Sequence, residues 1–251
     1  MKILKNSTFR IIFGGYLMIH FFELIPYAEE VFGNLMPFDP SLNPTYNFFP
    51  NILTYINATY FILLLFLLSV MFTLNIYVKL CSFLMWYGWA CLLNRNVLIH
   101  NPGISYVGWL LLAYTLISNN DLKTYDHIYW FSWFLMGAGY TISGLHKLQC
   151  PSWIDGTALF HILNEPIARD NLLRDYILLL PPIILKCITW FSLGLEILFL
   201  PLGMFYHTRF IFWMLYMSFH IGILLLINFT DLTLGVMMIH FFTFDYEWLN
   251  Y

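Results

Sequence analysis

Residues 127–158 of the chain read HIYWFSWFLMGAGYTISGLHKLQCPSWIDGTA. Their first part, 127–146, is predominantly apolar and reaches the length of about 20 residues that a helix needs to cross a bilayer. The run leaves His146 and Lys147 at its polar end. Three residues of a polar segment follow closely: Trp153, Asp155 and Gly156. We relate the rest of the chain to this junction, because ionisable groups at the end of an apolar span are costly and often functional.

The composition predicts a membrane protein. Of 251 residues, 60% are hydrophobic and only 10% are charged, whereas a soluble domain carries roughly 25% charged residues. Aromatic residues make up 20% of the chain, and Tyr and Trp favour the two membrane interfaces. The net charge of -3 is spread thinly, so no basic patch indicates nucleic acid as a partner. The partner expected from composition is the lipid bilayer.

The apolar segments predict an all-α, polytopic integral membrane bundle. We expect about eight transmembrane helices in a single domain, 1–251. Their approximate ranges are 9–25, 52–74, 77–93, 104–118, 127–146, 177–200, 210–228 and 232–244.

The distribution of Lys and Arg predicts the orientation. Eight crossings place both termini on one side, together with Lys2, Lys5, Arg10, Lys79, Lys123 and Arg209. The cations on the other side are Arg95, Lys147, Arg169 and Arg174. Six cations against four favour cytoplasmic termini in a plasma (inner) membrane. The external loops are then 26–51, 94–103 and 146–175.

We expect these external loops to converge. That would place Arg95, His100, His146, Lys147 and Trp153 around one external-facing cavity. Lys147 is then a base or an anion-binding group, or alternatively a lysine that snorkels to the interface. His146 is either a proton relay beside Lys147 or an ordinary interfacial histidine.

The residues after the junction are expected to shape the site. Trp153 suits an interface. Asp155 is expected to N-cap a short helix over 155–163, with Gly156 as its first residue. This helix is predicted to lie in the interface with Ala158, Leu159 and Ile162 facing lipid.

Ionisable residues inside the apolar segments need partners. Glu196 is expected to pair with Lys147, Arg95 or His220, and Lys186 needs a partner elsewhere. His220, Asn228 and Asp231 are expected on one helical face towards the bundle, with a hydrogen-bonding or a catalytic role. His20, Glu23 and His240 are weaker candidates of the same kind.

Other chemistry finds little support in the sequence. No two histidines stand four residues apart, as in an HxxxH pair of metal ligands, so we expect no metal. No serine nucleophile elbow, phosphate-binding loop or dinucleotide-binding glycine pattern is present. Cys81, Cys91 and Cys187 lie in apolar surroundings and are expected in the core, whereas Cys150 belongs to the polar segment.

The motif Gly144-x-x-Lys147-Leu148, followed by Trp153-x-x-Gly156, resembles the HTTM family. This family contains the membrane core of vitamin K-dependent gamma-carboxylase. The turn with Arg95-Asn96 and Ser105-Tyr106 is similar to that family too, as are the spans that hold Glu196 and His220. The likeness extends over most of the chain.

The resemblance implies that Lys147 is the base that deprotonates a reduced vitamin K or related quinone. A lysine acts as a base only when its amine is neutral, a state that burial favours. The chain departs from the carboxylase in having Ile104 before Ser105, where the carboxylase carries a functional histidine, and in showing no large lumenal domain.

Three functions remain open at this point. The first is a gamma-carboxylase-like enzyme with Lys147 as the base, acting on a membrane-soluble, quinone-like substrate at the external face. The second is a non-catalytic accessory protein for the maturation or export of a secreted peptide, as in small members of the family. The third is a transporter, for which no inverted repeat is evident.

Overall fold

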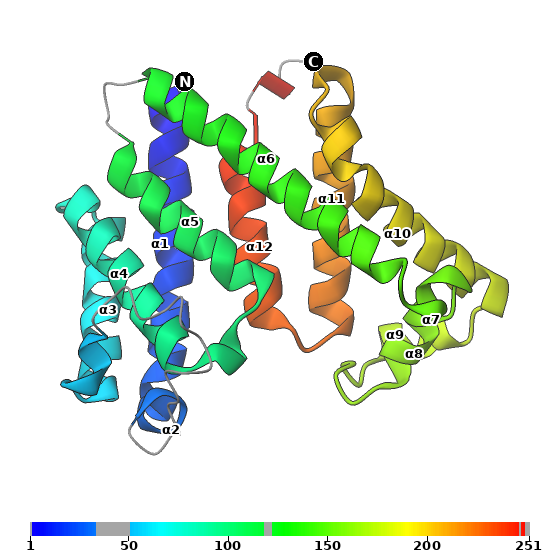
Figure 1. Cartoon of the computed structure of the whole chain (residues 1–251), viewed down its shortest axis with the longest axis horizontal. Coiled ribbons are helices and arrows are strands. Elements are labelled where there is room, and N and C mark those ends of the chain that lie inside the picture. Colours follow the sequence, from blue (N-terminus) through cyan, green and yellow to red (C-terminus); the bar gives the residue numbers. More distant parts are fainter. Residues whose placement is uncertain (1, 34–50, 118–121, 246, 249–251) are drawn as a thin grey trace. The chain divides into compact units, whose positions relative to one another are not determined.

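The computed structural model describes residues 2–33, 51–117, 122–245 and 247–248. Within these ranges the chain is helical and forms no β-strand beyond one isolated bridge, Ala168 to Ile227. The all-α prediction is therefore confirmed (Figure 1). The chain divides into two units, Met1–Asp126 and His127–Tyr251.

Unit 1 packs its longer helices around an aromatic core. Phe13 and Phe72 are fully buried, and Tyr114 meets Phe72 edge to face at 5.0 Å between ring centroids. Asparagine side chains cap the N-termini of two α-helices, as expected at this position: Asn57 caps one and Asn101 another. The helices are α1 (Lys2–Leu24), η1 (Ile25–Tyr27), α2 (Ala28–Phe32), η4 (Ile52–Thr54), α3 (Ala58–Thr73), α4 (Val78–Arg95), η5 (Val97–Ile99) and α5 (Pro102–Leu116).

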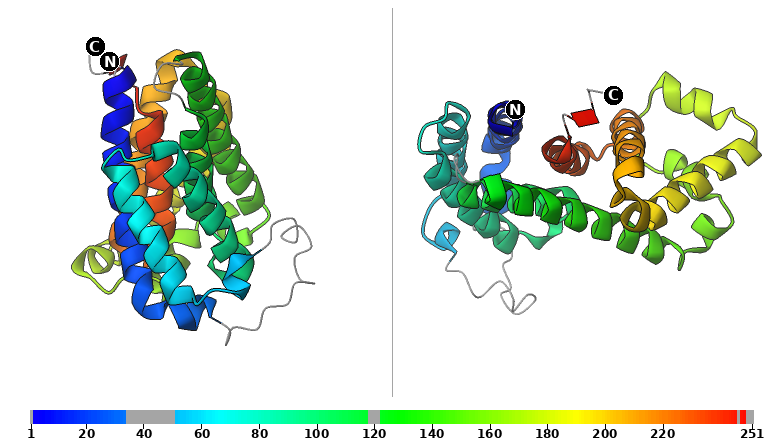
Figure 2. Two further views of the ribbon diagram at one scale, coloured as in Figure 1. Left: turned by 90° about the vertical axis from the view of Figure 1, so that its left-hand side faces the viewer. Right: turned by 90° about the horizontal axis from the view of Figure 1, so that it is seen from above.

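Unit 2 contains the junction. Its helices are α6 (Leu122–Lys147, which begins in unit 1), α7 (Pro151–Ile154), α8 (Ala158–Asn164), α9 (Leu172–Leu178), α10 (Pro182–Gly203), α11 (Tyr206–Leu226) and α12 (Thr230–Thr243). Helix α11 lies beside both α10 and α12, and α7 and α8 pack on α10 (Figure 2). The junction is thus held against the middle helices of this unit.

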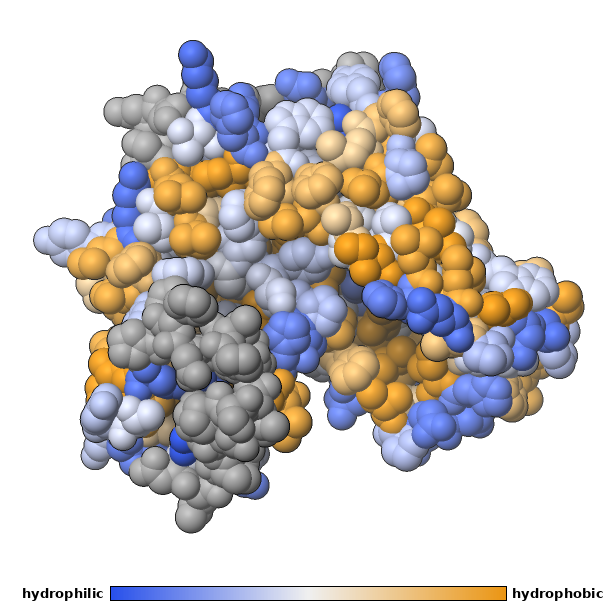
Figure 3. Space-filling view, viewed as in Figure 1, coloured by the Kyte–Doolittle hydropathy of each residue, from blue (hydrophilic) through white to orange (hydrophobic). Residues whose placement is uncertain are grey.

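Among the residues that the structure describes, three helical stretches are long and apolar enough to cross a membrane: Ser7–Phe32, Pro182–Gly203 and Tyr206–Leu226. Apolar residues gather over α10 on the face shown in Figure 3. Helices α3 and α5, with 16 and 15 residues, reach only about 24 and 22 Å at 1.5 Å per residue, and α12 with 14 residues about 21 Å. These lengths fall short of a typical hydrocarbon core of about 30 Å.

The predicted span 177–200 is two helices. Helix α9 ends at Leu178, and Pro181 has an extended ψ of 137° before α10 begins at Pro182. The cause is local, because a residue before proline avoids the helical region and proline suits the first helical position. Pro201 lies inside α10, beyond the predicted end of the span at residue 200.

Helix α11 ends earlier than the sequence suggested. Its C-cap Ile227 is extended, with φ -128° and ψ 140°. The Asn228 N–H donates to the Ile167 carbonyl at 2.8 Å, and the Arg169 N–H donates to the Leu226 carbonyl at 2.7 Å. The expected face through His220, Asn228 and Asp231 is therefore wrong, because the latter two lie beyond the helix.

Arg169 belongs to the same connection. Its guanidinium donates to the Ile227 carbonyl at 3.2 Å and to the Thr230 hydroxyl at 2.7 Å. This arginine therefore ties the segment before α9 to the turn between α11 and α12. Of the three cysteines expected in the core, Cys81 and Cys91 are buried, whereas Cys187 is exposed on α10. The expected loop 34–50 and the turn 118–121 lie outside the described residues.

Candidate functional site

Lys147 and Glu196 form a short ion pair inside unit 2. Lys147 ends α6, Glu196 lies in the middle of α10, and Nζ is 2.5 Å from Oε1. The Glu196 side chain is 5% exposed and the Lys147 side chain 25%. Ser143, one turn before Lys147, donates its hydroxyl to the other carboxylate oxygen at 3.3 Å. Of the three partners proposed for Glu196, the structure selects Lys147 and adds Ser143.

Trp153 completes the surroundings of the ammonium group. Lys147 Nζ lies 4.4 Å from the centroid of the Trp153 ring, within the range of a cation–π contact. The cation is thus enclosed by a carboxylate on one side and an aromatic face on another. Trp153 reaches it from α7, the short helix directly after α6.

Glycine and threonine on α6 bring α10 close enough for this pair. A Cβ at Gly144 would lie 2.9 Å from the Ile197 backbone nitrogen and 3.0 Å from Glu196 Cβ, which is tighter than real Cβ contacts. Small residues at such a crossing let two helix backbones approach. Gly144 therefore sets the spacing that puts the carboxylate beside Lys147.

Thr141 compensates for the proline inside α10. Pro201 has no N–H to offer to Ile197, the carbonyl four residues earlier. The Thr141 hydroxyl donates to that Ile197 carbonyl at 3.2 Å and accepts the Leu200 N–H at 3.1 Å. This polar contact locks α6 to α10 one turn from Gly144.

A second polar cluster lies on the same face of α6. Tyr140 is seven residues before Lys147, which is two helical turns or about 10.5 Å along the axis. Its hydroxyl is 2.5 Å from His220 Nε2 on α11 and 2.7 Å from His240 Nε2 on α12. All three residues are buried, with His220 3% and His240 0% exposed.

The hydrogen-bond balance of this cluster is incomplete. A phenol can donate to one imidazole and accept from the other. The Nδ1 atoms of both His220 and His240 are buried and have no hydrogen-bond partner in the described part of the chain. A buried polar atom without a partner costs about 1–3 kcal/mol, so two of them in one cluster call for an explanation.

The connection after α7 differs from the expected helix cap. The Asp155 carboxylate accepts the Thr157 N–H at 2.9 Å and the Thr157 hydroxyl at 2.6 Å. These hydrogen bonds lower the pKa of Asp155, since they favour the charged form. Helix α8 begins only at Ala158, so Asp155 shapes the turn before the helix and is not its N-cap.

This connection packs on α10. Gly156 has φ +82°, and a Cβ there would lie 2.9 Å from Lys186 Cβ. The Trp190 indole donates to the Ile154 carbonyl at 2.9 Å. Ala158, which we expected to face lipid, is 3% exposed and therefore buried.

The other predicted site residues make contacts within their own units. His146 is exposed at the end of α6, and its relay role stays a prediction. In unit 1, buried Arg95 donates to the carbonyls of Phe32 at 3.0 Å and Gly33 at 2.6 Å, at the end of α2. His100 Nε2 lies 3.2 Å from the Ser105 hydroxyl oxygen. Their convergence with Lys147 stays a prediction.

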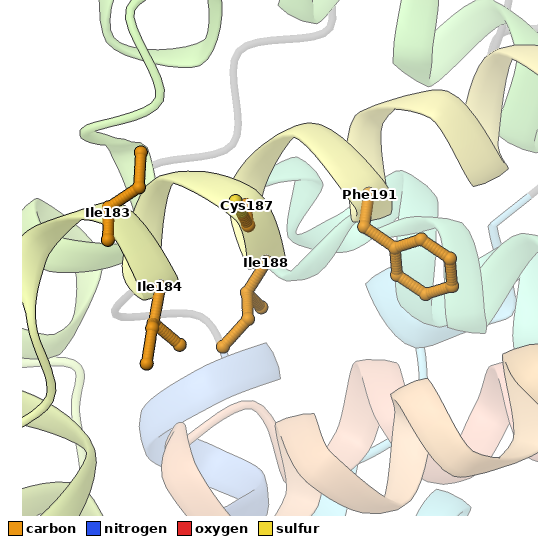
Figure 4. Close-up of a pocket in the computed structure, with 5 residues that line it drawn as sticks. All are labelled: Ile183, Ile184, Cys187, Ile188 and Phe191. Atoms are coloured by element: carbon orange, nitrogen blue, oxygen red, sulfur yellow. The ribbon is translucent and has the colours of Figure 1, made fainter.

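An apolar hollow of about 310 Å³ lies along α10 (Figure 4). It is lined by Ile183, Ile184, Cys187, Ile188 and Phe191. These side chains recur on one side of the helix and offer hydrocarbon and one thiol. They supply no charged group, so the chemistry of unit 2 centres on Lys147 and Tyr140. Among the described residues, no three His, Cys, Asp or Glu side chains gather as a metal site.

Comparison of the chain with protein-family models, with curated proteins and with solved structures finds no match.

Proposed function

We propose that the chain is an HTTM-like integral membrane enzyme in which Lys147 acts as a base on a membrane-soluble, quinone-like substrate. The observation that supports this proposal most directly is the ion pair of Lys147 with Glu196, 2.5 Å apart and almost closed to solvent at the carboxylate. A buried ion pair adds little net stability compared with apolar packing. A functional role therefore accounts better than stability for the presence of this buried ion pair.

The pair offers a route to a neutral amine. If the ammonium passes one proton to Glu196 Oε1, the charged pair becomes a neutral amine beside a neutral carboxylic acid. The amine then accepts the proton of a hydroquinone hydroxyl and becomes an ammonium again. Each transfer needs donor and acceptor within hydrogen-bond reach, a condition that the 2.5 Å distance meets for the first one.

The proposal includes about eight crossings, cytoplasmic termini and an external position for Lys147 in the plasma (inner) membrane. Helices α3, α5 and α12 are short for a bilayer core. Local thinning of the bilayer accommodates short spans at a modest cost per ångström. Exposed Cys150, three residues after Lys147, is a native reporter of sidedness. A membrane-impermeant maleimide should label it on intact cells, and Cys150→Ser should abolish that signal.

The test of the function is a calorimetric titration of the purified, detergent-solubilised protein with reduced and oxidised naphthoquinones. We expect saturable binding that weakens at least tenfold in Lys147→Ala. The matched control is Lys79→Ala, which removes an exposed lysine at the start of α4 and should leave binding unchanged. Absence of binding in the unaltered protein would refute the quinone proposal.

One observation favours a second function, that of an accessory protein for peptide maturation or export. A cation fixed between Glu196 and Trp153 suits recognition of an anionic group on a peptide. Lys147→Arg separates the two functions, because arginine stays charged and cannot act as a base. Turnover lost in this variant indicates the enzyme, whereas client maturation retained in it indicates the accessory protein.

A further inference from the structure

We propose that Tyr140, His220 and His240 form a buried proton relay, with the two Nδ1 atoms as its ends and the phenol as its middle. The relay rests on the proposed function only for the substrate that it would serve. Its existence can be tested without any quinone. The three side chains come from α6, α11 and α12 of unit 2.

The pattern of used and unused atoms supports a relay. Both Nε2 atoms point at the Tyr140 hydroxyl, at 2.5 and 2.7 Å. Both Nδ1 atoms are buried without a hydrogen-bond partner among the described residues. A purely structural histidine normally has its second nitrogen satisfied when buried. An imidazole that conducts protons instead needs one nitrogen on the chain of hydrogen bonds and the other open to receive or release a proton.

The proton count balances. At rest the first histidine carries its proton on Nε2 and donates it to the Tyr140 oxygen. The Tyr140 hydroxyl donates to Nε2 of the second histidine, which carries its own proton on Nδ1. A proton that arrives at Nδ1 of the first ring displaces its Nε2 proton to the phenol oxygen. The phenol proton moves to the second ring, whose Nδ1 proton leaves. One proton enters, one leaves, and the cluster ends in the mirror arrangement.

The surroundings keep the proton on this path. The Tyr140 ring packs against Tyr216 at 4.1 Å and Phe199 at 4.9 Å between centroids. The Trp213 indole donates to the His240 carbonyl at 2.8 Å and fixes α12 against α11. Aromatic faces exclude water from the sides of the cluster, so exchange with solvent has to pass through the Nδ1 ends.

Hydrogen exchange of the full-length protein tests this. We would label histidine and tryptophan with ¹⁵N, place the protein in detergent micelles and follow the ring N–H signals in D₂O. The internal reference is the Trp213 indole N–H, which is buried on the same helix pair and takes part in a structural hydrogen bond. We expect the protection of the His220 and His240 ring protons, each measured against exchange in the free ring, to be at least tenfold lower than the protection of this reference.

Three results would overturn the relay. The first is protection of the histidine protons, relative to the free ring, equal to or greater than that of the Trp213 indole. The second is the same tautomer in both rings, because the relay requires opposite ones. The third is a Zn²⁺ titration that shifts both rings together at one equivalent, which would identify a metal site. Tyr140→Phe should remove the coupling between the two ring signals, and the measurements on the unaltered protein stand even if this variant fails to fold.

The two proposals fail in different ways. Fast histidine exchange without quinone binding would refute the proposed function and keep the relay. Quinone binding that depends on Lys147, together with slow histidine exchange, would refute the relay and keep the proposed function. If both hold, Tyr140→Phe should leave quinone affinity unchanged and slow the proton release or uptake that accompanies quinone binding, measured by stopped-flow mixing with a pH indicator.

Discussion

The ion pair of Lys147 and Glu196 predicts an asymmetric response to removing either partner. In Lys147→Met the Glu196 carboxylate, 5% exposed, loses its counter-ion and keeps only the weak hydrogen bond from Ser143 at 3.3 Å. Breaking a buried pair in this way costs about 3–5 kcal/mol. We expect Lys147→Met to lower the free energy of unfolding by an amount in this range.

Glu196→Gln should cost less. The amide keeps the shape of the side chain and an acceptor for Ser143. The Lys147 side chain is 25% exposed, so its ammonium can turn to water. We expect a loss of about 1.5–3 kcal/mol, the cost of a hydrogen bond to a charged group. The double variant should be more stable than Lys147→Met alone, since it contains no unpaired buried charge.

Unfolding in mixed micelles, followed by tryptophan fluorescence, measures all four proteins of this double-mutant cycle. Residues in direct contact should be coupled, whereas independent sites are additive. Equal losses in the two single variants, or additive losses in the double variant, would refute the interpretation that Glu196 is a buried charge compensated by Lys147. A quinone that binds at this pair should also raise the stability of the unaltered protein by mass action.

Three further predictions concern the frame of the site. Gly144→Ala should lower the free energy of unfolding in mixed micelles by about 1–3 kcal/mol, because the added methyl group overpacks the contact with α10. The control is Gly194→Ala, where a Cβ meets nothing within 4 Å and should not destabilise the protein. Equal effects of the two substitutions would contradict the close approach at Gly144. Thr141→Val should cost about 1–2 kcal/mol in the same assay, because it leaves a carbonyl in α10 unsatisfied, and a loss near zero would show that the contact is unimportant. The pKa of Asp155 is lowered, so its stabilisation of the turn is present above the unfolded value of about 3.9 and is lost as pH falls through the lower folded value. The protection of the Thr157 N–H, measured against exchange in an unfolded chain at the same pH, should fall only below about pH 4. The same profile in Asp155→Asn would contradict this.

The sequence predicted the features that follow from amino-acid composition and from the free-energy cost of burying charge. Low charge and long apolar runs predicted helices, and the price of a carboxylate in such a run predicted a partner for Glu196. Both follow from the energetics of burial in an apolar medium. The selection of Lys147 among three candidates could not be made, because it depends on how α6 and α10 cross. The glycine at 144 was visible, but its role appears only when its neighbours on α10 are known.

Other features were hidden because local and tertiary effects compete. Tyr140 was missed as a functional candidate, since a tyrosine in an aromatic-rich helix is ordinarily a packing or interface residue. Its spacing of seven residues from Lys147 places both side chains on one face of the helix. This spacing was the one sequence feature that pointed to Tyr140, and it is weak evidence without the two histidines that contact the hydroxyl. His240 was ranked low for the same reason, because its partner is 100 residues away in the chain. The end of α11 depends on backbone hydrogen bonds from 167–169, which no periodicity in α11 reveals.

The position of the polar groups in unit 2 has a common cause in the backbone of α10. Pro201 leaves the carbonyl of Ile197 without its helical donor, and Thr141 supplies one. That contact fixes the register between the two helices, and Gly144, three residues on, allows the backbones to approach. In this register Glu196 can only meet the next turn of α6, where Ser143 and Lys147 lie. A proline that would ordinarily weaken a span therefore directs where a charge can be buried, and Tyr140, next to Thr141, is held towards His220 and His240 by the same lock.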